Sequence, residues 1–394
     1  MRTRFLPVRR SMVAGLAASA VAALALTAGG SPAIAATASL SVGVPAFGGG
    51  LTSLLNPTGG APQTYYEDGY GAIHQLNQNY GRWSDINVST PSAAIQARPG
   101  SALASLPLSS DRVYYFSGDG HLQELAQAWN WQTSTDVTVA SRGLPAVAGS
   151  GLAAIAVSGG NPRVYYINAA GHIEEMAWGG GWHQTDVTAG GAVAGAGSKL
   201  TAVALGGSSP RVYYTSAAGH IIELSWGGGW HSNDLTARVG GAVAEPGSSL
   251  SSVVANGNPA VYYTSGGGHI QELAYSGGWH VNDITARTGS VPAASRASLA
   301  AASRPPTGGV RVGYISADGH VRELHNDVGA GWVPADVTNS SAGPVATPQG
   351  GLTAIFASNP DGTFLRYYHT TASGDVVELA WNASYWYSTD ITAR

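Results

Sequence analysis

The chain repeats one unit of about fifty residues seven times, and this repeat restricts its fold more than any other feature. The clearest copy runs from Leu200 to Thr236. It contains four short runs rich in β-branched and aromatic residues, which clusters of Gly, Ser and Pro separate. This pattern predicts a four-stranded antiparallel sheet in which each strand pairs with the next.

One Asp near the end of each unit counts the copies: Asp85, Asp136, Asp186, Asp234, Asp283, Asp336 and Asp390. Intervals of this size suit the blade of a β-propeller, whereas a parallel β-helix has a much shorter period and a helical solenoid a 3.6-residue pattern. The sequence therefore predicts an all-β fold, a seven-bladed β-propeller of four-stranded antiparallel blades, with a six-bladed ring as the alternative. Because each unit contains all four strands in order, ring closure needs no strand from the other terminus.

The N-terminal residues have the pattern of an export signal. Basic residues come first, as Arg2, Arg4, Arg9 and Arg10. An apolar stretch from Met12 to Leu26 follows, and Ala33 to Ala35 supplies a small-residue cleavage site. We therefore predict a secretory signal peptide over residues 1–35, a flexible mature N-terminus over 36–49, a propeller over 50–394, and secretion from the cell. A retained membrane anchor is the alternative, but the apolar stretch is short for a span.

Composition excludes several classes of partner. The formal net charge is −4 and Lys and Arg do not cluster, so nothing favours nucleic acid. The chain has no Cys, which removes disulfides and thiolate metal sites. No segment after the signal is apolar for long enough to span a membrane. We expect no metal and no cofactor, and a closed ring is complete as a monomer.

Positions kept in all seven units are expected to build the blades. They include the closing Asp and a turn glycine, which suits a hairpin position with positive φ: Gly71, Gly120, Gly171, Gly219, Gly268, Gly319 and Gly374. A His follows that glycine in five units: His121, His172, His220, His269 and His320. One His per unit, about fifty residues from the next, does not make a metal cluster, so a structural role is expected.

An Arg, and a Glu twelve residues later, recur less evenly. The pairs are Arg112/Glu124, Arg163/Glu175, Arg211/Glu223, Arg311/Glu323 and Arg366/Glu378. This even spacing around a hairpin predicts that both residues lie on one face, nearly opposite each other, with Cβ atoms ~5 Å apart. The first unit has Gln63 and Gln75 instead, and the fifth has Ala260 with Glu272. The fold therefore tolerates loss of the pair, although an exposed ion pair worth ~0.2–1 kcal/mol is the simpler interpretation.

Aromatic residues follow the Glu at two positions. Three residues after it come Trp178, Trp226, Tyr275 and Trp381. A second Trp occurs in every unit, as Trp83, Trp131, Trp182, Trp230, Trp279, Trp332 and Trp386, and either core packing or a ligand wall explains it. Arg donates and Glu accepts hydrogen bonds with sugar hydroxyls, while an indole packs on the apolar face of a pyranose. The combination predicts carbohydrate binding.

These motifs resemble the Aleuria aurantia lectin-type fucose-binding β-propeller lectins, from about Leu51 to the C-terminus. In that family, Arg and Glu of one blade bind fucose and aromatic residues of the next blade form the wall, in a ring that typically has six blades. The resemblance implies sites in which Arg112 and Glu124 face Trp178 and Trp182, Arg163 and Glu175 face Trp226 and Trp230, Arg211 and Glu223 face Tyr275 and Trp279, and Arg311 and Glu323 face Trp381 and Trp386. It implies a doubtful site where Arg366 and Glu378 meet Gln78 and Trp83. It implies none at Gln63/Gln75 or at Ala260.

The leading hypothesis is therefore a secreted multivalent lectin, not an enzyme, whose partners are glycans or glycoproteins that carry L-fucose. A glycoside hydrolase is the second hypothesis, but it needs two carboxylates ~5–9.5 Å apart, and each unit offers one recurring Glu already paired with Arg. The third is a protein-interaction scaffold in which the Arg–Glu pairs are only salt bridges. A fucose titration separates the first hypothesis from the other two.

Overall fold

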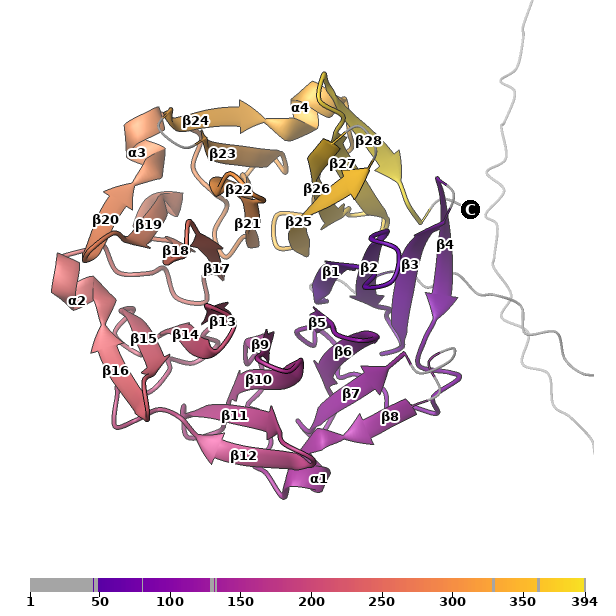
Figure 1. The fold of residues 1–394 in the computed structure, drawn as a ribbon. Coiled ribbons are helices and arrows are strands. Elements are labelled where there is room, and N and C mark those ends of the chain that lie inside the picture. The colour runs from indigo at the N-terminus through magenta and orange to yellow at the C-terminus, as the bar shows by residue number, and fades with distance from the viewer. Residues whose placement is uncertain are drawn as a thin grey trace, which may run out of the picture. The chain divides into compact units, whose positions relative to one another are not determined.

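The computed structural model describes residues 45, 49–79, 81–127, 131, 133–327, 330–359 and 362–392. Within them, strands β1 to β28 form seven sheets of four consecutive antiparallel strands, and the sheets stand around a ring (Figure 1). This confirms the predicted seven-bladed propeller, and the six-bladed alternative is wrong. In the part of the chain that the structure describes, each blade consists of four consecutive strands and borrows none from another terminus, as predicted. The predicted signal peptide and most of residues 36–49 lie outside the described residues.

The strands follow the chain blade by blade. Blades one to four comprise β1 (Leu51–Leu55), β2 (Pro62–Glu67), β3 (Ile73–Asn79) and β4 (Arg82–Asn87); β5 (Ala104–Pro107), β6 (Asp111–Phe116), β7 (Leu122–Ala126) and β8 (Thr133–Asp136); β9 (Leu152–Val157), β10 (Asn161–Ile167), β11 (Ile173–Trp178) and β12 (Trp182–Asp186); β13 (Leu200–Leu205), β14 (Ser209–Thr215), β15 (Ile221–Trp226) and β16 (Trp230–Asp234). Blades five to seven comprise β17 (Leu250–Ala255), β18 (Asn258–Thr264), β19 (Ile270–Tyr275) and β20 (Trp279–Asp283); β21 (Leu299–Arg304), β22 (Gly309–Ile315), β23 (Val321–Asp327) and β24 (Gly331–Asp336); β25 (Leu352–Asn359), β26 (Gly362–Thr370), β27 (Val376–Trp381) and β28 (Trp386–Asp390). Short helices α1 (Val137–Ser141), α2 (Leu235–Val239), α3 (Ile284–Thr288) and α4 (Val337–Ser341) follow blades two, four, five and six, and a 3-10 turn spans Gly266–Gly268.

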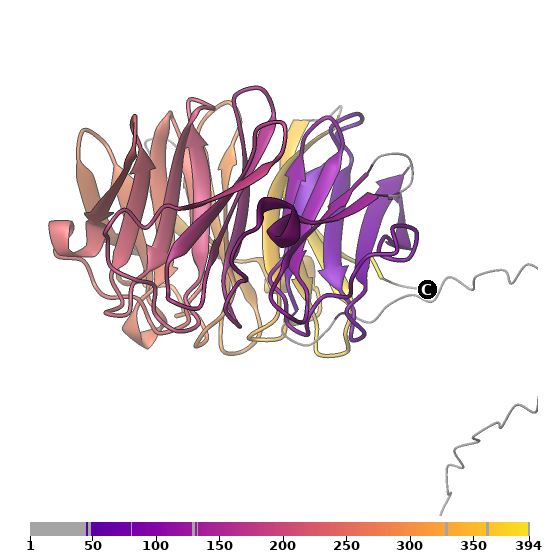
Figure 2. The same cartoon turned by 90° about the horizontal axis from the view of Figure 1, so that it is seen from below.

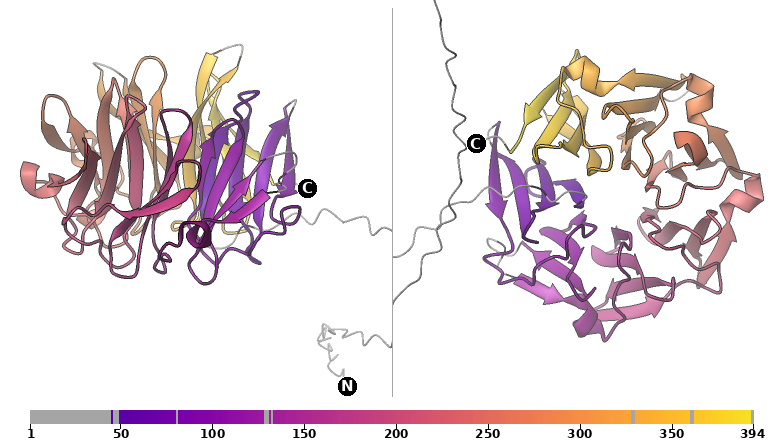
Figure 3. Two further views of the ribbon diagram at one scale, coloured as in Figure 1. Left: turned by 60° about the horizontal axis from the view of Figure 1, so that its bottom comes forward. Right: turned by 180° about the vertical axis from the view of Figure 1, so that it is seen from behind.

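The first strand of each blade lies innermost and the fourth lies on the rim (Figure 1). Seen from the side, the blades stand next to one another around the ring, and the view from behind shows the same order (Figures 2 and 3). Blade one packs beside blade seven, where the hydroxyls of Ser53 and Thr353 are hydrogen-bonded at 2.9 Å. At the ring's centre, a pocket of about 610 Å³ is lined by residues at the starts of all seven first strands.

The core lies between the sheets. One cluster combines Tyr114 and Leu122 of blade two with Val164, Met176 and Trp182 of blade three, all of them buried. Each blade thus buries one face of its sheet against its neighbour, which is how a propeller stabilises sheets that expose little of either face. Within the described residues, no helix is long and apolar enough to cross a membrane.

The turn glycine has the predicted positive φ in all seven blades. Gly268, for example, has a φ of 77°, and a Cβ placed on it would lie 2.3 Å from the carbonyl oxygen of Ala293. The amide of Ala293 donates back to the carbonyl of Gly268 at 2.8 Å. The glycine is therefore required both by the left-handed turn and by the close approach of the next connection.

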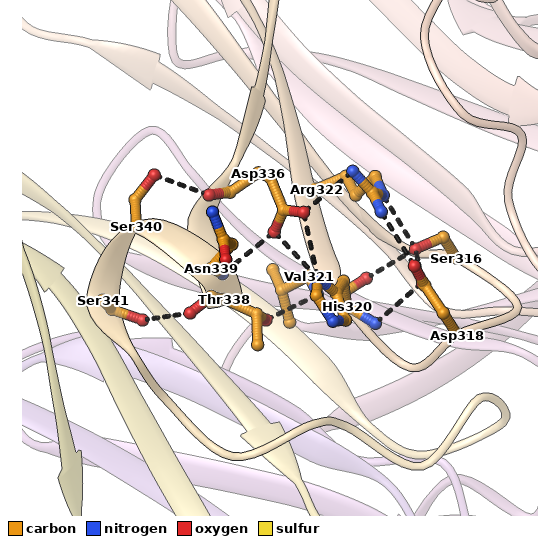
Figure 4. A network of polar contacts seen from close by, with 10 residues as sticks. All are labelled: Ser316, Asp318, His320, Val321, Arg322, Asp336, Thr338, Asn339, Ser340 and Ser341. Carbon is orange, nitrogen blue, oxygen red and sulfur yellow. Dashed lines mark hydrogen bonds and ion pairs between the residues drawn. The ribbon is translucent and has the colours of Figure 1, made fainter.

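The closing Asp and the His form a structural pair. Nδ1 of the His lies 2.6 to 2.9 Å from the Asp carboxylate in the pairs His121/Asp136, His172/Asp186, His220/Asp234, His269/Asp283 and His320/Asp336. In blade six, the other oxygen of Asp336 accepts from the amide of Asn339 and so caps α4, while Arg322 also reaches Asp336 (Figure 4). Among the described residues, no group of three or more His, Asp or Glu is placed to hold a metal.

Blade one departs from this scheme. In the register of β3 and β4, Asn87 pairs with His74 just as Asp186 pairs with Glu174 in blade three. The predicted closing residue, Asp85, lies two residues earlier, where it pairs with Nδ1 of His74 at 2.8 Å and also accepts from the Tyr66 hydroxyl. The prediction of a closing Asp in all seven blades is therefore wrong for blade one, because Asn87 occupies that position and caps the following turn through its side-chain oxygen.

Candidate functional site

The Arg and the Glu of a pair lie on the same face of adjacent strands, as predicted, but they are diagonal rather than opposite neighbours. In blade three, Arg163 pairs with Ala177 and Tyr165 pairs with Glu175. The hairpin is centred one residue later than the spacing suggested, and this shift moves the Glu two positions along the strand. The guanidinium still reaches the carboxylate, with Arg163 Nη1 lying 3.1 Å from Glu175 Oε1.

In blades two to five, the first Tyr of the Tyr-Tyr motif holds the Glu in place. The hydroxyl of Tyr165 donates to Glu175 Oε2 at 2.7 Å, and Tyr114 donates to Glu124 Oε1 at 2.9 Å. Burial raises the pKa of the Tyr114 hydroxyl well above its usual range, and the nearby Glu124 carboxylate raises it further. The phenol therefore stays protonated and donates a hydrogen bond at all physiological pH values. This bond fixes one carboxylate oxygen and leaves the neighbouring polar groups free to bind a ligand.

The second Trp of every blade but the seventh packs across the junction on a tyrosine of the preceding blade, whereas Trp386 packs on Tyr367 of its own blade. The ring pairs are Tyr65/Trp131, Tyr114/Trp182, Tyr165/Trp230, Tyr213/Trp279, Tyr262/Trp332, Tyr367/Trp386 and Tyr368/Trp83, with centroids 5.7 to 6.3 Å apart. The core packing that the sequence allowed is thus present, and Trp279 also lines the junction pocket described below, as the ligand-wall interpretation expects.

The first aromatic residue is the exposed one. Trp178, Trp226 and Tyr275 are 40%, 43% and 40% exposed, and each meets the second Trp of its own blade edge-on at 5.7 to 5.9 Å. At the junctions of blades two and three, three and four, and four and five, the fold thus brings an Arg–Glu pair beside an exposed ring of the next blade. The residues predicted for these three sites are together.

The junction of blades four and five is hollowed into a pocket of about 340 Å³. Arg211, Glu223, Tyr275 and Trp279, which the sequence predicted, line it with six further residues: Leu205, Asn233, Arg238, Gly257, Asn258 and Pro259. The sequence interpretation missed these six. Asn233 could have been predicted from the sequence, because the fourth strand places this residue directly opposite Glu223 in the register. Arg238 belongs to α2 and follows the closing Asp234 by four residues, a position at which Arg287 and Arg394 recur in two other units.

The open junctions keep their arginines accessible to solvent. The side chains of Arg112, Arg163 and Arg211 are 25%, 31% and 27% exposed, against 13% and 12% for Arg311 and Arg366. Burial raises the pKa of the Glu124 carboxyl, and the Arg112 guanidinium lowers it again. The pair therefore offers a ligand both a cationic donor and a carboxylate acceptor at the junction of blades two and three.

The junction of blades six and seven brings its predicted residues together, but with a competing contact. Arg311 Nη2 lies 2.9 Å from Asp327, whereas its Nε is 3.8 Å from Glu323. His325 Nδ1 lies 3.1 Å from the same Glu323 oxygen. On the aromatic side, Trp381 meets Trp386 at 5.8 Å. This junction is therefore complete in residue types, but its guanidinium is turned toward an acidic partner of its own blade.

The remaining junctions are closed or incomplete. Between blades seven and one, Arg366 Nη1 lies 2.5 Å from a Glu378 carboxylate that is 1% exposed, which is the geometry of a buried ion pair. Between blades one and two, Gln75 is buried, donates to the Tyr65 hydroxyl and accepts from the Trp131 indole. At each of these two junctions, the polar side chains bind one another rather than a ligand. Between blades five and six, Glu272 remains but Ala260 replaces the Arg.

Comparison with known proteins places this geometry in context. A sequence profile described as fungal fucose-specific lectin matches residues 55–253 and 245–392. The solved structure of AofleA from Arthrobotrys oligospora is 19% identical, covers 89% of this chain and 88% of its own, and has a TM-score of 0.55. The six-bladed Aleuria aurantia lectin is 23% identical, covers 73% and 94%, and has a TM-score of 0.53.

A third similar structure is the BP39L lectin from Burkholderia pseudomallei, which is 15% identical over 87% of this chain and 98% of its own, with a TM-score of 0.65. At these identities, the likeness to solved structures shows the fold alone. No curated protein sequence matches the chain.

Proposed function

The chain belongs to the fungal fucose-specific lectin family, and from this premise we propose that it is a secreted, multivalent lectin that binds L-fucose at several blade junctions. A lectin binds carbohydrate without catalysing a reaction, so the glycoside hydrolase hypothesis is set aside. The observation that carries the proposal is the accessible Arg–Glu pair beside an exposed aromatic ring, repeated at three consecutive junctions.

The chemistry of each open junction suits a deoxyhexose. The guanidinium donates to hydroxyl and ring oxygens, the carboxylate accepts from hydroxyls, and the exposed indole or phenol packs on the apolar face and methyl group of the sugar. Each hydrogen bond contributes a net ~0.5–1.5 kcal/mol, and a charged partner contributes more, so a single shallow site binds modestly. Several sites on one ring gain by avidity at a glycan-bearing surface. Residues 1–35 support export.

A calorimetric titration of L-fucose into the mature protein tests the proposal. We expect saturable binding at more than one site, and a triple variant Arg112→Ala/Arg163→Ala/Arg211→Ala that loses most of the binding heat. Arg287→Ala, on the exposed face of α3, controls for loss of positive charge and is expected to bind normally. Absence of fucose binding by the unmodified protein would refute the assignment. Export is tested separately, by sequencing the N-terminus of protein collected from the medium.

A further inference from the structure

The junction of blades five and six keeps the carboxylate of a binding site but has no cation of its own. Glu272 of β19 lies diagonally to Ala260 of β18, at the position where Arg211 stands in blade four. Glu272 is half-buried. Among the described residues, no Lys, Arg or His forms an ion pair with it, whereas the equivalent Glu223 lies 3.5 Å from Arg211.

Apart from that loss, the surroundings of the two carboxylates match closely. The Tyr262 hydroxyl donates to Glu272 Oε1 at 3.0 Å, and Asn282 Nδ2 donates to Oε2 at 3.3 Å. In blade four, the Tyr213 hydroxyl and Asn233 make the corresponding bonds at 3.2 and 3.5 Å. The carboxylate is therefore held in the same orientation at both junctions, and only its cationic partner is missing.

The space left by the missing side chain is part of a pocket of about 390 Å³. Its polar lining comes from Glu272, Tyr262, Ser276, the exposed ring of Tyr275 and three asparagines, Asn256, Asn258 and Asn326. Ala260 lies at the pocket wall, and no basic residue lines the pocket. Asn326 of blade six occupies the position that Tyr275 occupies in blade five. Among the described residues of blade six, none therefore presents an exposed ring at this position for stacking on a neutral sugar.

We propose that this pocket binds an amino sugar, a hexose carrying a primary ammonium group in place of a hydroxyl, such as D-glucosamine. The ammonium takes the place of the absent guanidinium against Glu272, where a half-buried carboxylate gains most from a cationic donor. The phenol face of Tyr275 adds a cation–π contact, and the amides of the three asparagines that line the pocket serve the remaining hydroxyls. A neutral sugar leaves the carboxylate without a counter-charge and binds more weakly.

The proposal does not depend on fucose binding, because it concerns a junction that lacks the Arg. Its test is a titration followed by ligand-observed NMR, with D-glucosamine at mildly acidic pH, where its amine is charged. D-Glucose and N-acetyl-D-glucosamine are the matched uncharged probes. We expect D-glucosamine to bind about tenfold more tightly than either, the factor that about 1.4 kcal/mol corresponds to. Equal binding of the three sugars would overturn the proposal.

Two variants locate the site. Glu272→Gln keeps the acceptor for the Tyr262 hydroxyl but removes the charge, and it is expected to abolish the preference for D-glucosamine. Its matched control, Glu223→Gln, makes the same change at the neighbouring junction and is expected to leave that preference intact. Ala260→Arg places a guanidinium beside Glu272 and should prevent D-glucosamine from binding. It tests the same site independently, should Glu272→Gln fold poorly. A preference that survives both changes at this junction would overturn the assignment, while fucose titration of the same samples reports on the other junctions.

Discussion

The hydroxyl of Tyr367 in blade seven donates a hydrogen bond of 3.0 Å to the carboxylate of Glu323 in blade six. In blades two to five, the tyrosine that orients the Glu belongs to the same blade. Blade six has Gly313 opposite Glu323 instead. A Cβ at Gly313 would lie 2.3 Å from the Tyr367 ring, so the tyrosine of the next blade fills the space that a tyrosine at 313 would occupy.

This exchange predicts strong coupling between positions 313 and 367. Tyr367→Val leaves a cavity in a fully buried site and is expected to lower the free energy of unfolding by about 3 kcal/mol. Gly313→Tyr alone collides with the Tyr367 ring and is expected to be at least as damaging. The double variant restores the arrangement of the other blades and should recover most of the loss. Denaturant unfolding of all four proteins measures the coupling, and additive losses would contradict the exchange.

The two tryptophans of blade four are predicted to act differently when each is replaced by Ala. Trp226 is 43% exposed, so Trp226→Ala should remove fucose binding at the junction of blades three and four with little change in stability. Trp230 packs on Tyr165 across the same junction, so Trp230→Ala should also lower the free energy of unfolding, by about 3 kcal/mol. Calorimetry with fucose and thermal unfolding read the two effects. Equal stability losses in both variants would contradict this division.

The sequence predicted those structural features that depend on residues recurring from unit to unit. The number of blades and the strand order follow from residues that recur in phase, whereas the pairing of Arg163 and Glu175 with aromatics of the next blade was implied by the resemblance to the lectin family. The diagonal placement of Arg163 and Glu175 was missed, because a hairpin whose pairing is centred one residue later keeps both side chains on the same face.

What the repeat could not reveal are contacts made by residues that occur once. Asp327 ends β23 beyond the common blade pattern, and only the folded strand brings it to Arg311. Tyr367 stands where other blades have Val164 or Val212, and its role depends on the glycine of a different blade. Each contact forms only in the tertiary structure, so the spacing of residues along the sequence does not predict it.

The contact between Arg311 and Asp327 predicts a gain of function. Asp327→Ala removes the competing carboxylate and frees the guanidinium for Glu323 and for a ligand at the junction of blades six and seven. Because the Asp327 side chain is 50% exposed, the loss of stability should not exceed about 1 kcal/mol. Fucose titration is expected to show more binding heat, or one more site, than in the unmodified protein. Unchanged binding would mean that the ion pair does not restrict this junction.

The pH dependence of stability is predicted to reflect Asp111, which is buried beside Tyr65. Burial raises the pKa of this carboxyl from 3.8 to about 6, and the hydrogen bonds from Tyr65 and Gln63 only partly offset the rise. Below pH about 4 the carboxyl is protonated in both the folded and the unfolded chain, and it costs nothing. As the pH rises to about 6, the unfolded chain loses the proton first, so the folded state is progressively destabilised, by on the order of 1–3 kcal/mol in total.

Asp111→Asn removes this titration while keeping an acceptor for the Tyr65 hydroxyl. Relative to the unmodified protein, the variant should therefore gain stability as the pH is raised from about 4 to about 7, whatever fixed offset the amide introduces. Asp119→Asn is the control, because the hydrogen bond from Ser117 lowers the pKa of that exposed carboxyl and gives the opposite sign. Urea unfolding across this range measures both differences. A difference between Asp111→Asn and the unmodified protein that stays constant with pH would show that Asp111 is ionised in the fold at acidic pH, against the effect expected from its burial.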